Sequence, residues 1–447
     1  MNPSERHGDM DSKHEASAPT LMTRRDALAL SAAMLAGGIA GPVTAAIDGG
    51  GLVTTTADIE AVWRRFCDGI YETGRRVLAL APNTSPASAA EALQFATRSL
   101  RLALDFRLDG YDPRHPHLIW VDRTSAAAIP LAPNVDNSYI FARLDGRETY
   151  RLSITTDTID ELNLSVHAGH YAEDAFVQQW GNVTLKELKP VNGRLEVILS
   201  ATRHEGNWLQ IGEQAKFMFL RIYYFDWQKG RPPAVSLTCL SANAPQPNSI
   251  PPEDLVAGLA ETITWMRTQI ENEQAFAKKF IARAGGKKNA FFAAQNETGA
   301  PQAYRYAGAE FELAPDEALV VEFRPPRGRY WIVQWHRLPW GDSADFFNHI
   351  TSVNNHQAHV DSDGLVRLVF AAQDPGVQNW LSTEGRRNGL IYARWFWSDD
   401  PQTPQPVSRV VPVGEVRSRL PADTPSFGPE QRARQLDIRR HHLRLRY

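Results

Sequence analysis

The chain has 447 residues, 43% hydrophobic and 22% charged, with a formal net charge of -3 at pH 7. This composition is typical of a globular protein with enough apolar residues for a sizeable core, and the length corresponds to two or three domains. The small negative charge excludes a dedicated nucleic-acid-binding protein, and a count of 2 cysteines excludes a cysteine-rich metal site. Whether Cys67 and Cys239 pair stays open.

Residues 1–45 indicate an export signal rather than a folded element. Arg24 and Arg25 precede a run of small apolar residues over 27–40, and residues 43–45 resemble a cleavage site before Ala46. A twin arginine, a weakly hydrophobic stretch and a polar leader are typical of twin-arginine (Tat) export. The apolar run is short for a membrane span. We therefore expect a periplasmic or secreted protein without a transmembrane segment after signal cleavage, although an uncleaved anchor remains the alternative.

Helical spacing of apolar residues predicts a helical hairpin within residues 46–117. Its helices are expected over 58–80 and 88–108, on either side of the proline-bounded break at 82–86. A further long helix is expected over 252–284, and residues 251–288 would link two β regions.

Short runs of β-branched and aromatic residues between turn signals predict two β domains, at 118–250 and 289–412. We expect a mainly β protein with helical decoration, built from two β-sandwich or jelly-roll-like lobes. The two β regions are candidates for distant copies of one fold. Residues 413–447 are rich in arginine and are expected to form a basic, solvated, partly helical tail.

Successive side chains of a β-strand point to opposite faces of the sheet, so the predicted strands assign several candidate ligand-binding residues to one face or the other. Trp335 shares a face with Trp331, whereas His336 lies on the opposite face with Tyr330. Arg324 and Arg394 also lie within strands, where a buried guanidinium needs a partner. That partner is either a ligand carboxylate, sulfate or phosphate, or one of the chain's own acids. The candidate acids are Glu322, Asp374 and Glu384.

The loop after residue 372 contains Asp374, Asn379 and Trp380 between two predicted strands. One interpretation is structural, because Asp and Asn side chains stabilise turns by bonding to nearby backbone groups. The other is a ligand site, in which Asp374 acts as a base, Asn379 binds the ligand and Trp380 stacks on a ring.

A second polar cluster, containing Asp136, Asn137 and Tyr139, precedes a predicted strand. The cluster either forms the turn that leads into the strand, which we call the strand-entry interpretation, or belongs to a catalytic site. In the latter, Asp136 is the general base, Tyr139 or His336 is the acid, and Asn137 binds the ligand.

Two histidine pairs raise the question of a metal, namely His167 with His170 and His356 with His359. Asp361 and Asp363 follow the second pair, but zinc and iron sites usually take a third ligand from elsewhere in the chain. The sequence also lacks a nucleophile elbow, a P-loop, a dinucleotide-binding glycine motif and an HExxH motif. We therefore expect neither a metal nor an organic cofactor.

Several motifs resemble the DUF1214 family of uncharacterised bacterial proteins. These are Asp374-Pro-Gly-Val-x-Asn-Trp-Leu with Gly385 and Arg394, the segment 134–139, the segment 145–152, Gly206-Asn-Trp-Leu and the segment 221–227. The resemblance covers about residues 59–397 and implies a mostly β architecture without an established activity.

The leading hypothesis is an exported envelope protein that binds or processes a small polyhydroxylated, ring-shaped or anionic compound, such as a saccharide. Arg324 and Arg394 would hold charge, and Trp335 and Trp380 would stack in an Arg/Trp-lined cleft. The alternatives are a cofactor-independent hydrolase or lyase with Asp/Tyr/His acid–base chemistry, and an envelope interaction protein that uses the basic tail. The sequence does not predict an oligomeric state.

Overall fold

The computed structural model describes residues 55–121, 132–169, 178–241, 245, 249–297, 303–398 and 404–446. The expected export signal and His170 lie outside these ranges. Within them, no helix combines the length and apolar character that a membrane span requires.

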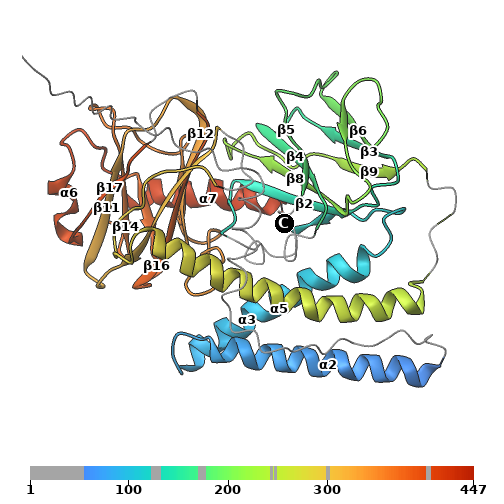
Figure 1. Ribbon diagram of the computed structural model, residues 1–447. Coiled ribbons are helices and arrows are strands. Elements are labelled where there is room, and N and C mark those ends of the chain that lie inside the picture. The colour runs from blue at the N-terminus through green and yellow to red at the C-terminus, as the bar shows by residue number, and fades with distance from the viewer. Residues whose placement is uncertain are drawn as a thin grey trace, which may run out of the picture. The chain divides into compact units, whose positions relative to one another are not determined.

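The expected hairpin is formed by α2 (Thr56–Ala79) and α3 (Pro86–Leu104), which pack with the linking helix α5 (Pro252–Arg283) (Figure 1). Thr55 and Asp58 cap α2 reciprocally, so the N-terminal backbone amides are satisfied. Val62 and Phe66 of α2 pack against apolar residues of α5. The hairpin thus covers α5, and α3 continues into the short π-helix η1 (Asp105–Asp109).

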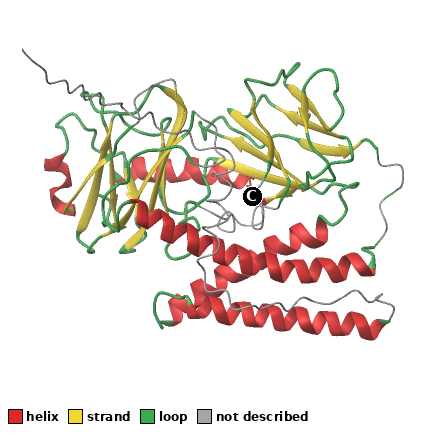
Figure 2. Ribbon diagram, viewed as in Figure 1, coloured by secondary structure: helices red, strands yellow, loops and turns green. Residues whose placement is uncertain are grey.

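The first lobe consists of two β-sheets, and Figure 2 shows the strands in yellow. The first sheet has the order β1-β2-β8-β4-β5, with β1 (Ile119–Trp120), β2 (Asn137–Arg143), β8 (Phe217–Tyr223), β4 (Glu161–His167) and β5 (Gln179–Thr184). The second has the order β7-β6-β3-β9, with β7 (Trp208–Gln210), β6 (Arg194–Ser200), β3 (Tyr150–Thr155) and β9 (Val235–Cys239). Alternate residues of both sheets form one apolar core, which makes the lobe a sandwich.

The second lobe repeats this arrangement. Its first sheet, called sheet C here, has the order β10-β16-β12-β13, with β10 (Arg305–Glu312), β16 (Asn388–Ser398), β12 (Gly328–His336) and β13 (Ser352–Asn354). The facing sheet has the order β15-β14-β11-β17, with β15 (Trp380–Ser382), β14 (Val366–Ala371), β11 (Glu317–Phe323) and β17 (Val407–Pro412). Trp331, Trp335 and Trp395 contribute to the core between these sheets.

The two lobes have the same strand order, since β2 to β9 in the first correspond one by one to β10 to β17 in the second. Both β6–β7 and β14–β15 are parallel, whereas the other strand pairs are antiparallel. The expectation of a mainly β fold with two sandwich-like lobes and helical decoration is therefore confirmed. The shared strand order supports the interpretation of the β regions as two copies of one fold.

The C-terminal segment differs from the expected solvated tail. After the short helices η3 (Val413–Glu415) and α6 (Val416–Arg419), it forms α7 (Pro429–Arg446). Arg432, Arg439 and Arg446 of α7 are each less than 10% exposed. Proline at the start of α7 suits a first helical turn, where its missing amide is not needed. The solvated-tail interpretation was wrong because three arginines of this helix bond to carbonyl oxygens inside the protein.

Candidate functional site

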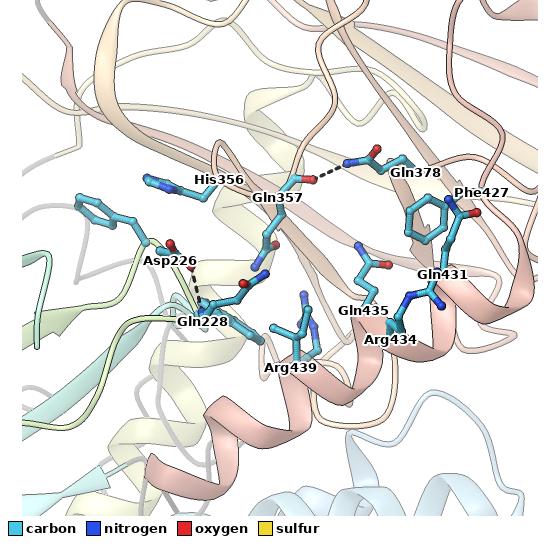
Figure 3. Close-up of a pocket in the computed structure, with 13 residues that line it drawn as sticks. Asp226, Gln228, His356, Gln357, Gln378, Phe427, Gln431, Arg434, Gln435 and Arg439 are labelled. Atoms are coloured by element: carbon cyan, nitrogen blue, oxygen red, sulfur yellow. Dashed lines mark hydrogen bonds between the residues drawn. The ribbon is translucent and has the colours of Figure 1, made fainter.

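The candidate site is an open cleft of about 330 Å³ beside α7. Its walls come from the loop after β8, the turn after β13, the turn before β15 and one side of α7 (Figure 3). Five of its lining residues are glutamines, namely Gln228, Gln357, Gln378, Gln431 and Gln435. Phe225, Phe427 and Ile438 add apolar surface. Loops on rigid strands and a packed helix thus converge on one open cleft.

Hydrogen bonds fix the orientation of the two glutamine amides that belong to α7. The Gln431 Oε1 accepts from the Gly428 backbone amide at 2.7 Å, and the Gln435 Oε1 accepts from Arg432 at 2.5 Å. Because the side-chain oxygens of Gln431 and Gln435 accept these bonds, the NH₂ groups of these two residues remain for other contacts. The wall formed by α7 therefore presents hydrogen-bond donors.

Arg434 and His356 also line the cleft, and the Arg434 guanidinium adds to this donor character. The carboxylate in the cleft, Asp226, forms an ion pair with Lys229 at 3.0 Å. Partial burial opposes ionisation of Asp226, but the bonds from Lys229 and the Gln228 backbone lower the pKa of this carboxyl. Asp226 is therefore ionised and held by its neighbours, and His356 interacts with it electrostatically.

The inner end of the cleft rests on a stack of aromatic and cationic groups. The Arg439 guanidinium lies 4.4 Å from the Trp227 ring centroid, and His442 stacks on the same ring at 5.2 Å. Arg439 donates to the backbone oxygens of Phe346 and Ser352. Burial lowers the pKa of Arg439 to about 10, a shift that Asp136 opposes. Arg439 therefore remains charged at neutral pH and rigid.

Asp136 lies one layer beneath the cleft and does not line it. Its carboxylate accepts from Trp227 Nε1, the Tyr330 hydroxyl and Asn354 Nδ2, each at 2.8 Å. Burial raises the pKa of the Asp136 carboxyl, although these three bonds favour the charged form. Because Asp136 is 1% exposed and bonded on both oxygens, it organises the floor of the cleft rather than reaching a ligand there.

The two residues predicted beside Asp136 are also internal. Tyr139 is buried, and its hydroxyl accepts from the Asn134 backbone amide at 2.8 Å. Asn137 is 2% exposed and begins β2. The structure thus brings Asp136 together with Tyr330, not with Tyr139, and the strand-entry interpretation describes the cluster better.

The predicted turn residues support the cleft from behind. Asp374 accepts from its own turn at Gly376 and from Arg432 Nε at 2.9 Å, so it anchors α7. The Trp380 ring is half-buried and lies 4.9 Å from the Arg432 guanidinium, with its Nε1 bonded to the Ala371 oxygen. The turn therefore positions α7, and the neighbouring Gln378 lines the cleft.

Asn379 has a structural role with a counterpart in the first lobe. It accepts from the His359 amide and donates to the His359 and Arg367 oxygens. Asn207 makes the same three bonds, to Lys189 and to the Glu196 oxygen. Each asparagine precedes a short parallel strand that starts with tryptophan. The Asn-Trp-Leu motif thus fastens a loop in both lobes.

The other predicted residues lie elsewhere. Trp335 is fully buried in the core with its Nε1 bonded to the Ser382 oxygen, so it offers no stacking surface. Arg324 is exposed and donates to the Asp363 and Gly364 oxygens. His336 and Arg394 are buried on the face of sheet C that points away from that core. Glu322, a proposed partner of Arg324, pairs instead with Arg367 and Arg409.

In the part of the chain that the structure describes, neither the histidine pairs nor the cysteines belong to a group of side chains that could bind a metal ion. No group of three or more His, Cys, Asp or Glu side chains there is placed to hold a metal ion. His359 lies 3.5 Å from Asp361, which is itself bonded to Arg367. Cys67 is exposed and Cys239 is buried, and both are free thiols.

The sequence interpretation expected a partly helical tail but missed that α7 packs beside the cleft, to which it supplies Gln431, Arg434 and Gln435. A signal for it is present, because Arg432, Arg439 and Arg446 recur every seven residues. Leu436 and Leu443 recur at the same interval. This spacing places them on one side of a helix.

The chain is similar in structure to an uncharacterised protein from Burkholderia cenocepacia, with a TM-score of 0.71 and 28% identity. The match covers 79% of this chain and 98% of that chain. The VPA0106 protein from Vibrio parahaemolyticus matches 71% of this chain and 98% of its own, with a TM-score of 0.42 and 13% identity. No protein-family profile and no curated protein matches the chain. The first likeness supports the fold and brings no activity with it.

Proposed function

We propose that this protein binds a small, oxygen-rich, acidic compound, such as an acidic monosaccharide, in the glutamine-lined cleft. The observation that carries the proposal is the convergence of five glutamines and Arg434 on one open cavity of about 330 Å³. Amide groups and cations at the edge of an apolar surface suit a ligand with many oxygen acceptors and a ring to pack.

The donor character of the α7 wall favours an acidic ligand over a neutral one. Gln431 and Gln435 keep their NH₂ ends for a ligand, because their oxygens are already used by Gly428 and Arg432. Arg434 has no ion-pair partner among the described residues. A carboxylate next to Arg434 would therefore gain a charge-assisted hydrogen bond. Phe427 would pack against the ring.

An acid–base enzyme acting in the same cleft is the second candidate. The observation that favours it is the electrostatic contact between Asp226 and His356, which both line the cleft. In that case Asp226 would act as base and His356 as acid on a bound ligand. Asp136, which the sequence suggested as the base, is a weaker candidate because its carboxylate already accepts hydrogen bonds from three donors.

We also propose that the protein is an exported envelope protein of the DUF1214 type, on the basis of the twin-arginine segment and the motifs named above. An interaction function of the C-terminal segment is a weaker candidate. Three of its arginines are buried in α7, which leaves a smaller basic surface than the sequence suggests.

Calorimetric titration with glucuronate and glucose tests the proposal. We expect glucuronate to bind and glucose to bind at least about tenfold more weakly, the equivalent of one lost charge-assisted hydrogen bond. Arg434→Gln should remove this preference. Arg440→Gln is the matched control, because Arg440 lies on the same helix outside the cleft and its ion-pair partner among the described residues is the exposed Asp437, at 4.0 Å.

Equal binding of both sugars by all three proteins, or binding of neither, would contradict the acidic-ligand proposal. The enzyme alternative makes a separate prediction. Asp226→Asn would keep glucuronate binding and would abolish turnover of any substrate found for the protein.

A further inference from the structure

A second feature lies inside the protein, on the face of sheet C opposite its core. Arg394 of β16 is 4% exposed there, and its guanidinium lies 4.2 Å from the Tyr392 ring centroid. One nitrogen, Nη2, donates to the Ala132 oxygen. The second terminal nitrogen, Nη1, is buried and has no hydrogen-bond partner among the described residues. A guanidinium buried with an open donor is costly unless another group compensates it.

The first lobe shows how the fold satisfies an arginine at the equivalent position. Arg221 of β8 lies between Tyr139 of β2 and Asn163 of β4, and its Nη1 donates to Asn163 Oδ1 at 2.8 Å. Arg394 lies between Tyr306 of β10 and Ile332 of β12. Ile332 has no acceptor to offer. The chain thus supplies an acceptor in one lobe and leaves the position open in the other.

His336 adds a second unsatisfied group to the same face. It is fully buried, and neither ring nitrogen has a partner in the part of the chain that the structure describes. Burial, and then the charge of Arg394, lower the pKa of His336 well below its ordinary value. The ring is therefore neutral and carries one N–H donor.

The surroundings of these two groups are mainly apolar. Leu390, Phe280 and Phe292 belong to one buried apolar cluster together with Tyr392. The acid on this face, Glu310, forms an ion pair with Lys288 rather than with Arg394. Tyr306, the cross-strand neighbour of Arg394, is partly buried on the same face.

We propose that Arg394 and His336 form an internal binding site for a small carboxylate. One carboxylate oxygen accepts from Arg394 Nη1 and the other from the His336 N–H, while Leu390 and Phe280 contact the carbon body of the ligand. The bound anion neutralises Arg394, as no acid of the described residues does. This site shares no residue with the glutamine-lined cleft.

Thermal unfolding in sodium acetate tests the proposal, with acetate replacing chloride at constant ionic strength. We expect the Tm of the native sequence to rise by about 2 °C at saturating acetate, because a ligand that binds only the folded state stabilises it. Arg394→Met should lose this response. Arg324→Met is the matched control, since the exposed Arg324 donates to the backbone oxygens of Asp363 and Gly364. Arg434→Gln, in the cleft, should also keep the response.

The imidazole nitrogen signals of His336 in ¹⁵N-labelled protein give a readout that needs no variant at Arg394. They should shift over the acetate range that raises the Tm. An acetate response that persists in Arg394→Met, or an absence of both the Tm rise and the His336 shift, would overturn the proposal. Failure of glucuronate binding in the cleft would leave this result unaffected, because the two sites are tested by different ligands and variants.

Discussion

At the scale of single residues, the buried carboxylate of Asp136 is the group on which the floor of the cleft depends. It holds Trp227, Tyr330 and Asn354 in place through three hydrogen bonds of 2.8 Å. In Asp136→Asn, an NH₂ group would face at least one of these donors, so a buried donor would lose its acceptor. We expect the free energy of unfolding to fall by about 2–3 kcal/mol. Urea denaturation measures this, and a variant as stable as the native protein would show that the network contributes little.

His442 supplies the residue-scale prediction for pH. Burial, followed by the charges of Arg446 and Arg231, lowers the pKa of His442 to about 3. Between that value and the ordinary pKa of about 6.5, the unfolded chain binds a proton that the folded protein does not. Stability from this group is therefore present above pH 6.5 and is lost as the pH falls. We expect a loss of about 2 kcal/mol between pH 7 and pH 5. His442→Phe should show a flatter stability profile over this range, and an unchanged profile would contradict the assignment.

At the scale of elements, Arg432 fastens α7 to the turn that contains Asp374. Its guanidinium bonds to Asp374, the Val377 oxygen and Gln435. We expect Arg432→Met to lower the free energy of unfolding by about 3 kcal/mol, since a mostly buried ion pair is broken from one side. It should also weaken ligand binding, because α7 forms one wall of the cleft. Arg440→Met on the same helix should change stability by less than about 0.5 kcal/mol. Equal effects of both substitutions in urea denaturation would contradict this role of Arg432.

The Asn-Trp-Leu turns allow a second comparison at this scale. Asn379 is 6% exposed, whereas Asn207 makes the same three bonds at a more exposed position. We expect Asn379→Ala to cost about 2–3 kcal/mol and Asn207→Ala about 1 kcal/mol. Neither should change ligand affinity at 25 °C in the remaining folded protein. A selective loss of affinity in Asn379→Ala would restore the prediction that Asn379 binds the ligand.

At the scale of the whole molecule, the sequence predicts those helices and strands in which buried apolar residues recur at a regular interval. Helical spacing locates α2, α3 and α5, and alternation assigns Trp335 to the core face and His336 to the opposite face. The sequence makes the two β regions candidates for copies of one fold but does not give the shared strand order, because equivalent strands share a topology and few residues. The cleft is also hidden, because its glutamines come from segments that are distant in sequence and meet only when the lobes and α7 are folded. The sequence identifies Asp136 and Asp374 as candidate site residues. It does not identify their partners, Tyr330 and Arg432, because these come close only in the folded protein.

The central claim is that the ligand occupies the cleft beside α7, and hydrogen–deuterium exchange with and without glucuronate tests it most directly. The account predicts slower exchange in the segments 225–228 and 431–439, which line the cleft, and no change in β16. Arg434→Gln should abolish the protection, whereas Arg440→Gln should keep it. Protection confined to β16, or glucuronate binding without protection of α7, would contradict the account.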